Sequence, residues 1–378
     1  MKKFFLSAIF LWLAAIVFGQ QALPKPGFDE ALQQIAERYQ TVGLAIVVVK
    51  NNQPVYSEAF GYKDRETKEK LTVNDLFRIA SISKSFTATA LMQLVEKDEI
   101  SLEDDFGDLV GFPVRNPHFP DKKITLEMVL SHRSSINDKN GYFDLDVINP
   151  QKNKDWANSY NNVEPGTHYQ YCNLNFNMAG AVLEKLTGVR FDEYIDRKIL
   201  QPLHLNAGYC VDSLNKSLFV SLYEYDSGKF VKQQAAYNPR SEEIKNYVMG
   251  QSTPVFSPTG GMKISANDLA KYMLMHMNDG KYKTGRILQK KSAKKMQQKL
   301  SDKEGYGLAL QEVDDLIDGV HLIGHTGSAY GLYSNMFFNP EKKYGFVVIT
   351  NGCTPHRSGD YLALSKDMIN LLYQHFIK

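Results

Sequence analysis

Three groups of residues carry side chains that could perform chemistry together. The first is Ser81-Ile82-Ser83-Lys84, which precedes a stretch whose apolar residues have helical spacing. Residues one turn apart share a helix face, so the amine of Lys84 can reach the hydroxyl of Ser81. A serine needs a base to become a nucleophile, and unpaired N–H groups at a helix N-terminus favour developing negative charge. Ser81 could instead be a simple helix cap, and this motif alone does not separate the two roles.

The second group lies in the segment 165–173, just before another stretch of helical spacing, where Tyr171 and Asn173 flank a single residue. Alternate side chains of an extended segment point the same way, so a phenol and an amide can both enter one cleft. Tyr169 has the same parity, and the chain holds 21 tyrosines. Ordinary packing is therefore the competing interpretation of Tyr171.

The third group is Gly324-His325-Thr326-Gly327-Ser328, on a predicted strand that turns at Gly331 into the next one. Glycines in a strand let another backbone, such as that of a substrate, approach closely. His321 and His325 would form a metal pair only on a helix, and the glycines argue for a strand. No metal site and no cofactor is predicted.

Apolar periodicity predicts the elements that must position these groups. It places helices at 28–39 and 361–376 and strands at 43–49, 55–60, 320–323, 333–338 and 346–350. Between these ends, helical spacing dominates, as in 86–97, 126–130 and 175–186. The predicted fold class is α/β (α+β): an antiparallel sheet built from the N- and C-terminal segments and flanked by helices, with an inserted, mostly helical region. We expect the sheet part at 24–80 and 255–378, the helical part at 81–254, and the active site in the cleft between them.

The first nineteen residues read as a secretory signal peptide, since Lys2 and Lys3 precede an apolar run from Phe4 to Phe18. That run has about fifteen residues where a membrane span needs roughly twenty, so no stable span is expected after its removal. The protein is expected to be periplasmic or extracellular. Removing Lys2 and Lys3 leaves equal numbers of basic and acidic residues, which gives no reason to expect nucleic-acid binding.

With 378 residues, 43% of them hydrophobic and 23% charged, the chain is long enough to bury a large core. Its three cysteines, Cys172, Cys210 and Cys353, are an odd number, and we interpret them as reduced packing residues. The cationic run 290–299 has helical spacing and is interpreted as a solvated face. The sequence carries no signal for an oligomeric state.

The order of the three groups resembles the serine β-lactamase and penicillin-binding-protein superfamily, in the branch of class C β-lactamases, D,D-carboxypeptidases and related esterases. Further similarities lie at 131–134, at Gly260-Gly261 and at 306–308. The resemblance implies a β-lactamase/transpeptidase-like fold, with Ser81 as the nucleophile. Lys84 and Tyr171 would share the serine proton, although which of them is neutral at rest stays open.

The same resemblance implies roles for the remaining site residues. The backbone N–H groups of Ser81 and Ser328 would form the oxyanion hole. Asn173 would bind the acyl side chain of the substrate, while His325, Thr326 and Gly327 would lie along its carboxylate or leaving group. The implied function is an exported serine hydrolase that acts through an acyl-enzyme on an ester or amide. Alternatives are a D,D-carboxypeptidase or β-lactamase, an acyltransferase, and a non-catalytic penicillin or peptidoglycan sensor.

Two departures bear on the substrate. The segment 131–135 lacks a glycine that is common in this family, and His325 stands where β-lactamases usually carry lysine. Histidine, with an ordinary pKa of roughly 6.5, is mostly neutral at pH 7. We therefore expect hydrolysis of short-chain esters and feeble turnover of penicillins. Carboxylate substrates should be handled better in His325→Lys or at a pH near 6.

Overall fold

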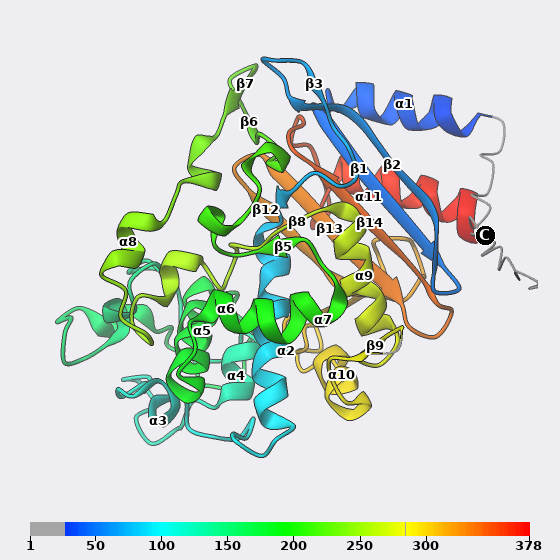
Figure 1. The fold of residues 1–378 in the computed structure, drawn as a ribbon. Coiled ribbons are helices and arrows are strands. Elements are labelled where there is room, and N and C mark those ends of the chain that lie inside the picture. The colour runs from blue at the N-terminus through cyan, green and yellow to red at the C-terminus, as the bar shows by residue number, and fades with distance from the viewer. Residues whose placement is uncertain (1–26, 284) are drawn as a thin grey trace, which may run out of the picture.

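A seven-stranded antiparallel sheet, in the order β11-β12-β13-β14-β1-β2-β3, forms the centre of the computed structural model, which describes residues 27–283 and 285–378 (Figure 1). Its strands are β1 (Gly43–Lys50), β2 (Gln53–Asp64), β3 (Glu69–Lys70), β11 (Gln311–Val313), β12 (Leu322–Ala329), β13 (Leu332–Asn339) and β14 (Tyr344–Thr350). The N- and C-terminal segments meet where β1 pairs with β14, with Val47 opposite Val347. The predicted fold class is confirmed. The expected signal peptide at 1–19 lies outside the described residues.

Strand β1 is apolar without alternation because both faces of the sheet are covered. Its residues Leu44, Ile46 and Val48 belong to the core shared with the helices α1 (Phe28–Arg38) and α11 (Ala363–Leu372). The alternate residues, such as Val47, belong to the core on the other face, where α9 (Ala266–Met277) packs against β1, β13 and β14. Figure 1 shows α1 and α11 side by side on their face of the sheet.

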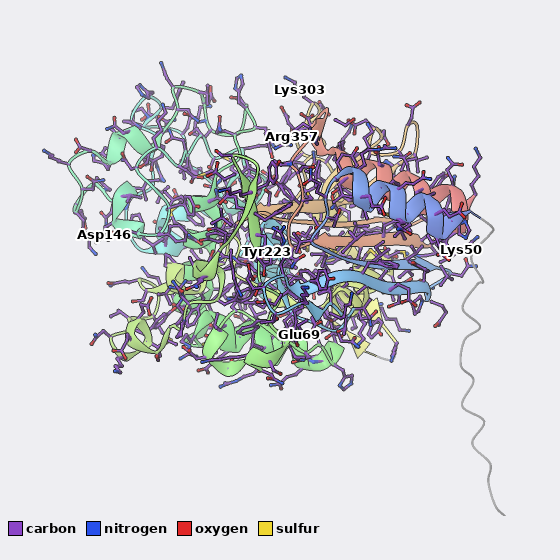
Figure 2. The ribbon with its side chains drawn as sticks, turned by 90° about the horizontal axis from the view of Figure 1, so that it is seen from above. Lys50, Glu69, Asp146, Tyr223, Lys303 and Arg357 are labelled. Carbon is purple, nitrogen blue, oxygen red and sulfur yellow. The ribbon has the colours of Figure 1, made fainter. Side chains whose placement is uncertain are left out.

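The region between the two halves of the sheet is mostly helical, as expected. Its helices are α2 (Ser83–Val95), α3 (Phe106–Val110), α4 (Leu126–Leu130), α5 (Asn173–Thr187), α6 (Phe191–Ile195), α7 (Gln201–Leu203) and α8 (Ser241–Lys245). It also contains the hairpin of β6 (Tyr223–Asp226) and β7 (Lys229–Lys232), and it shares a small sheet of β4 (Phe77–Arg78), β8 (Lys263–Ile264) and β5 (Ala207–Gly208). In Figure 2, Asp146 of this region and Lys50 at the end of β1 lie at opposite ends of the molecule, with Tyr223 between them. The cationic run forms α10 (Lys290–Gln297).

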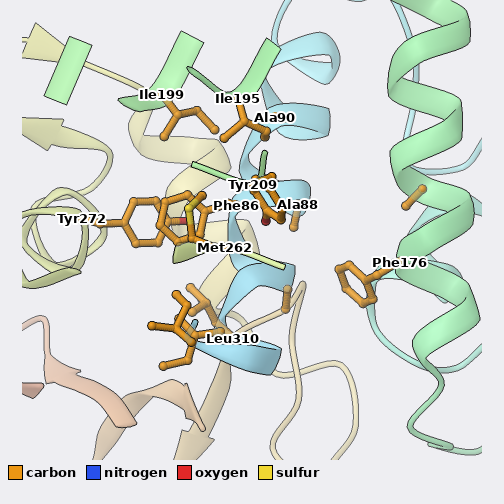
Figure 3. Close-up of a cluster of buried hydrophobic side chains, with 14 of the residues drawn as sticks. Phe86, Ala88, Ala90, Phe176, Ile195, Ile199, Tyr209, Met262, Tyr272 and Leu310 are labelled. Carbon is orange, nitrogen blue, oxygen red and sulfur yellow. The ribbon is translucent and has the colours of Figure 1, made fainter. Parts of the chain in front are cut away.

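Helix α2 runs through the interior and is buried on nearly every side. Its Phe86 stacks on Tyr272 of α9, with ring centroids 3.7 Å apart, inside the apolar cluster of Figure 3. The same core continues to Phe176 of α5 in the helical region. Because close-packed interiors resist displacement, α2 is a rigid support for the residues at its N-terminus.

The three cysteines are buried and free, which confirms their interpretation as reduced packing residues. Across 27–283 and 285–378, no helix combines the length and apolarity that a membrane crossing requires. In the same residues, no group of three or more His, Cys, Asp or Glu side chains is placed to hold a metal ion.

Candidate active site

Ser81 lies in a 3-10 turn, Ala80–Ile82, that leads directly into α2. Ala80 has a φ of 47°, a left-handed conformation that is costly for a residue with a side chain and is often retained near functional sites. Strand β12 passes so close that a Cβ on Gly327 would lie 2.2 Å from the carbonyl oxygen of Ile79. Gly327 therefore lets the strand of the third group pack against the turn that carries Ser81.

Lys84 follows on the first turn of α2, and its side chain is fully buried. Its Nζ lies 3.1 Å from Oγ of Ser81, 3.0 Å from Oδ1 of Asn173 and 2.9 Å from the carbonyl oxygen of Thr259. A neutral amine has two N–H donors and one lone pair. The amide and carbonyl oxygens can only accept, so they occupy the two donors. The lone pair then remains for the proton of Ser81.

The charge state of Lys84 follows from this neutral surrounding. Burial lowers the pKa of Lys84 to about 7, against the opposing effect of the Asp138 carboxylate. Burial also raises the pKa of the Tyr171 phenol, and a hydrogen bond with Ser81 only partly opposes that shift. The ring of Tyr171 lies 4.7 Å from Nζ of Lys84. Near neutral pH, the arrangement therefore offers an amine that can take a proton beside a phenol that keeps its own.

Asp138 orients the second group, and the motif patterns gave no sign of it. One of its oxygens accepts from the backbone N–H and the Nδ2 of Asn173, and the other accepts from the backbone N–H of Leu174. The carboxylate thus caps the start of α5, where negative charge is favourable. It also fixes the amide of Asn173 so that Oδ1 faces Lys84. A fixed amide orientation is what makes Asn173 an acceptor for the lysine.

Asn173 is the first residue of α5 and does not lie in the extended segment that the sequence predicted. Tyr171 and Asn173 still line one cavity together. Thr259, the other acceptor of Lys84, also donates its hydroxyl to Oδ1 of Asn173 at 2.9 Å. Thr259 directly precedes the Gly260-Gly261 pair. The sequence could not single it out, because Thr259 contacts Lys84 through its backbone carbonyl.

His325 lies on β12 but not in the wall of the cavity that Ser81 faces. Its side chain is 4% exposed, with Nε2 2.8 Å from the hydroxyl of Tyr306 and Nδ1 2.5 Å from the carbonyl oxygen of Thr326. A carbonyl only accepts, so Nδ1 carries the proton and Nε2 accepts from Tyr306. Burial and the nearby Lys84 lower the pKa of His325 to about 4. The expectation that a pH near 6 would charge His325 does not fit this environment.

Thr326 and Ser328 share one face of β12 and His325 lies on the other, because side chains alternate along a strand. Ser328 is exposed and lines the cavity with Ser81, whereas Thr326 is half-buried and does not line it. The geometry thus brings Ser81, Lys84, Tyr171, Asn173 and Ser328 together. It places His325 in an aromatic cluster behind them, with His132, Tyr169 and Tyr306.

The cavity above Ser81 has a volume of about 580 Å³, large enough for a small ester, amide or peptide. Tyr142 and Phe143 bring aromatic surface to it, and the ring of Phe143 is largely exposed. A larger hollow of about 680 Å³ lies beside α1 and the start of β1. We assign the site to the smaller cavity because it contains the serine and its base.

Comparison with known proteins agrees with this architecture. The "Protein flp" of Staphylococcus aureus strain N315 is 24% identical over 85% of this chain, which spans 62% of that relative's length. A solved octameric penicillin-binding protein homologue from Pyrococcus abyssi superposes with a TM-score of 0.73 at 26% identity, over 92% of this chain and 77% of its own. EstCE1, described as a hydrolase with promiscuous acyltransferase activity, gives a TM-score of 0.72 at 20% identity, over 91% and 98%. The family model described as Beta-lactamase matches residues 28–367, so the chain belongs to the β-lactamase family.

Proposed function

We propose that the protein is an exported serine hydrolase that acts through an acyl-enzyme on an ester or amide. The observation that carries this proposal is the fully buried Lys84, held against Ser81 with both amine donors taken by neutral oxygens. Membership in the β-lactamase family supports the same chemistry. The substrate class is left open between simple esters, amides and peptides.

In the proposed acylation, the lone pair of Lys84 takes the proton of Ser81 as the serine oxygen bonds to the substrate carbonyl carbon. The carbonyl electron pair moves onto oxygen, where the backbone N–H groups of Ser81 and Ser328 stabilise it. Loss of one such donor commonly costs roughly 3 to 4 kcal/mol in the barrier. When the tetrahedral intermediate collapses, the leaving group departs with a proton delivered through Tyr171, which Lys84 replaces.

Deacylation reverses these roles. Water bonds to the acyl carbon, gives a proton to the Lys84–Tyr171 pair and releases the acid, while Ser81 recovers its hydrogen. An alcohol or amine in place of water would receive the acyl group instead. The alternative functions therefore share one acyl-enzyme intermediate. Acyl transfer differs in the acceptor, and peptidoglycan D,D-peptidase and β-lactamase activities differ in the substrate. A sensor differs in that its acyl-enzyme stays trapped.

Intact-mass spectrometry tests this proposal. The purified protein is exposed in turn to a p-nitrophenyl ester of a short acid, a penicillin and a D-Ala-D-Ala peptide. We expect rapid formation and decay of the ester adduct and slow turnover of the penicillin adduct. An adduct that forms and never decays would instead support a sensor.

The control variant is Ser81→Ala, which should gain no adduct while keeping its circular dichroism spectrum. Ser83 and Ser85 are the nearest alternative nucleophiles, but each donates its hydroxyl to a backbone carbonyl, that of Ala80 and of Ile82 respectively. Adduct mass on either serine in the Ser81→Ala protein would contradict the assignment.

Export rests on the sequence of residues 1–19 alone. If it is correct, protein recovered from the periplasm or medium should begin near Gln20. Retention of Met1 in a membrane fraction would contradict it, and N-terminal mass analysis distinguishes the two results.

A further inference from the structure

Arg78 is a buried cation in the wall of the same cavity. It belongs to β4, three residues before Ser81, and its side chain is only 8% exposed. Its Nε donates to the carbonyl oxygen of Gly260 at 2.8 Å, and its guanidinium carbon lies 5.1 Å from the ring centre of Tyr330. Within 27–283 and 285–378, no carboxylate comes within ion-pair distance of this guanidinium. Burial lowers the pKa of Arg78, in keeping with a guanidinium that has no carboxylate beside it.

A buried charge without a counter-ion is costly, and proteins seldom retain one without pairing it. The charged residues that line this cavity in the described part of the chain are Arg78 and Glu224. Glu224 is exposed and forms no ion pair with Arg78. A guanidinium presents several N–H donors in a planar fork that suits a carboxylate. Its missing counter-ion can therefore be a group that enters the cavity.

Ser257 gives a second, independent observation on the same wall. Its Oγ is buried and has no hydrogen-bond partner, although Ser257 lines the cavity. Its φ of 54° is left-handed, and it directly precedes Pro258, which makes that conformation still less favourable. The carbonyl oxygen of Ser257 accepts from the N–H of Gly260, the residue that also binds Arg78. One strained turn therefore joins the unpartnered hydroxyl to the uncompensated cation.

We infer that Arg78 and Ser257 form a subsite for a carboxylate on the substrate. The guanidinium supplies the charge, and the hydroxyl of Ser257 rotates to donate a further hydrogen bond. This inference rests on the proposed function and makes it more specific. It also changes the expectation drawn from His325. The cation that selects an anionic substrate is Arg78, just before the first group of the chain, and not a residue of the third group.

Matched substrate pairs test the subsite from both sides of the scissile bond. The acyl pair is p-nitrophenyl hydrogen adipate and its methyl ester, and the leaving-group pair is 3-carboxyphenyl acetate and 3-methoxycarbonylphenyl acetate. We expect kcat/KM to favour the carboxylate member of at least one pair by tenfold or more. Arg78→Gln should lower that ratio by about 10- to 100-fold, and Ser257→Ala should lower it less.

Arg65→Gln is the matched control, because Arg65 loses the same charge outside this cavity, where its guanidinium lies over Phe230. Its ratio should equal that of the wild type. If Arg78→Gln does not fold, Arg78→Lys, which keeps the charge and loses the fork, should still lower the ratio. Equal kcat/KM within both wild-type pairs, or a ratio unchanged in a folded Arg78 variant, would overturn the inference.

A binding measurement separates this inference from the proposed chemistry. In Ser81→Ala protein, calorimetry should show tighter binding of monomethyl adipate than of dimethyl adipate, with the difference lost when Arg78→Gln is added. If this binding preference is found but the wild type is never acylated, the subsite stands and the serine hydrolase is rejected. If the wild type is acylated but the binding preference is absent, the serine hydrolase stands and the subsite is rejected.

Discussion

Two buried lysines of this protein have opposite surroundings. Lys84 touches the neutral oxygens of Ser81, Asn173 and Thr259, and its pKa falls to about 7. Lys63 of β2 is also buried, but it forms ion pairs with Glu69 and Asp75. Burial alone would lower its pKa, and the two carboxylates outweigh that effect and raise it. Burial dominates at Lys84 and leaves a base, whereas the two carboxylates dominate at Lys63 and leave a permanent cation.

The largest expected effect comes from removing the lysine without a counter-ion. Lys84→Met should lower the rate of Ser81 acylation by about 10²- to 10⁴-fold, because the Tyr171 phenol, which also hydrogen-bonds Ser81, has a raised pKa and keeps its own proton. Stability should change little or rise, since a poorly compensated amine leaves the core. Quenched-flow mass spectrometry measures the rate, and a variant with near wild-type acylation would remove Lys84 from the mechanism.

The ion-paired lysine should behave in the opposite way. Lys63→Met leaves the buried Asp75 without its cation, which commonly costs about 3 kcal/mol or more in the free energy of unfolding. Acylation by the folded protein should stay near the wild-type rate. Urea unfolding and the same mass assay check both expectations, and unchanged stability would show that the comparison between the two lysines is wrong.

Buried histidines extend the comparison to a second residue type. Burial lowers the pKa of His276 to about 3 and, with the charge of Lys84, that of His325 to about 4. In the unfolded chain, these two histidines take up a proton near pH 6.5. The stability gained by keeping them neutral in the fold is therefore complete above that pH. It is lost as the pH falls toward the folded-state values, by about 2 kcal/mol per histidine at pH 5.

His276→Gln provides the test of this pH dependence. Between pH 7 and pH 5, the variant should lose about 2 kcal/mol less of its unfolding free energy than the wild type. An equal loss in both proteins would show that His276 is not held neutral. His325, with a pKa of about 4, stays neutral between pH 6 and 8. The preference for charged over neutral esters should therefore not change over this range through His325.

The smallest expected effect concerns Asp138, the carboxylate whose charge acts on Lys84. Asp138→Asn removes the charge that raises the pKa of Lys84, so the acid limb of the acylation rate should move to lower pH. Asparagine also caps helices well, so the unfolding free energy should change by no more than about 1 kcal/mol. Asp146→Asn, which loses an exposed partner of Lys152, is the matched control. An acid limb that moves equally in both variants would contradict the role of Asp138.

The family resemblance, carried by the order of the three groups, was enough to predict that Ser81, Lys84, Tyr171 and Asn173 share one site, whereas each motif alone was not. The antiparallel sheet could also be predicted, since β-branched runs at both ends of the chain need a common partner. Strand β11 was missed because its residues, Gln311–Val313, are few and partly polar.

The side-chain direction of His325 could not be predicted in the same way. The strand pattern predicts only which residues share a face with His325. Which of the two faces is buried depends on Tyr306, a residue outside the strand that hydrogen-bonds His325. Asp138 and Thr259 were missed for a related reason. Each acts on the site through a contact with a remote segment, and neither forms a recognisable pattern with its own neighbours.

The central claim is that Lys84 is a neutral base for Ser81 near pH 7, and the pH dependence of Ser81 acylation tests it most directly. The pre-steady-state rate of adduct formation with an uncharged p-nitrophenyl ester should be measured by intact mass from pH 5 to pH 10. The account predicts a rate that falls below an apparent pKa of about 7 and levels off above it. A rate that keeps rising toward pH 10, as an ordinary lysine would give, or one that is flat from pH 5 to pH 9, would contradict it.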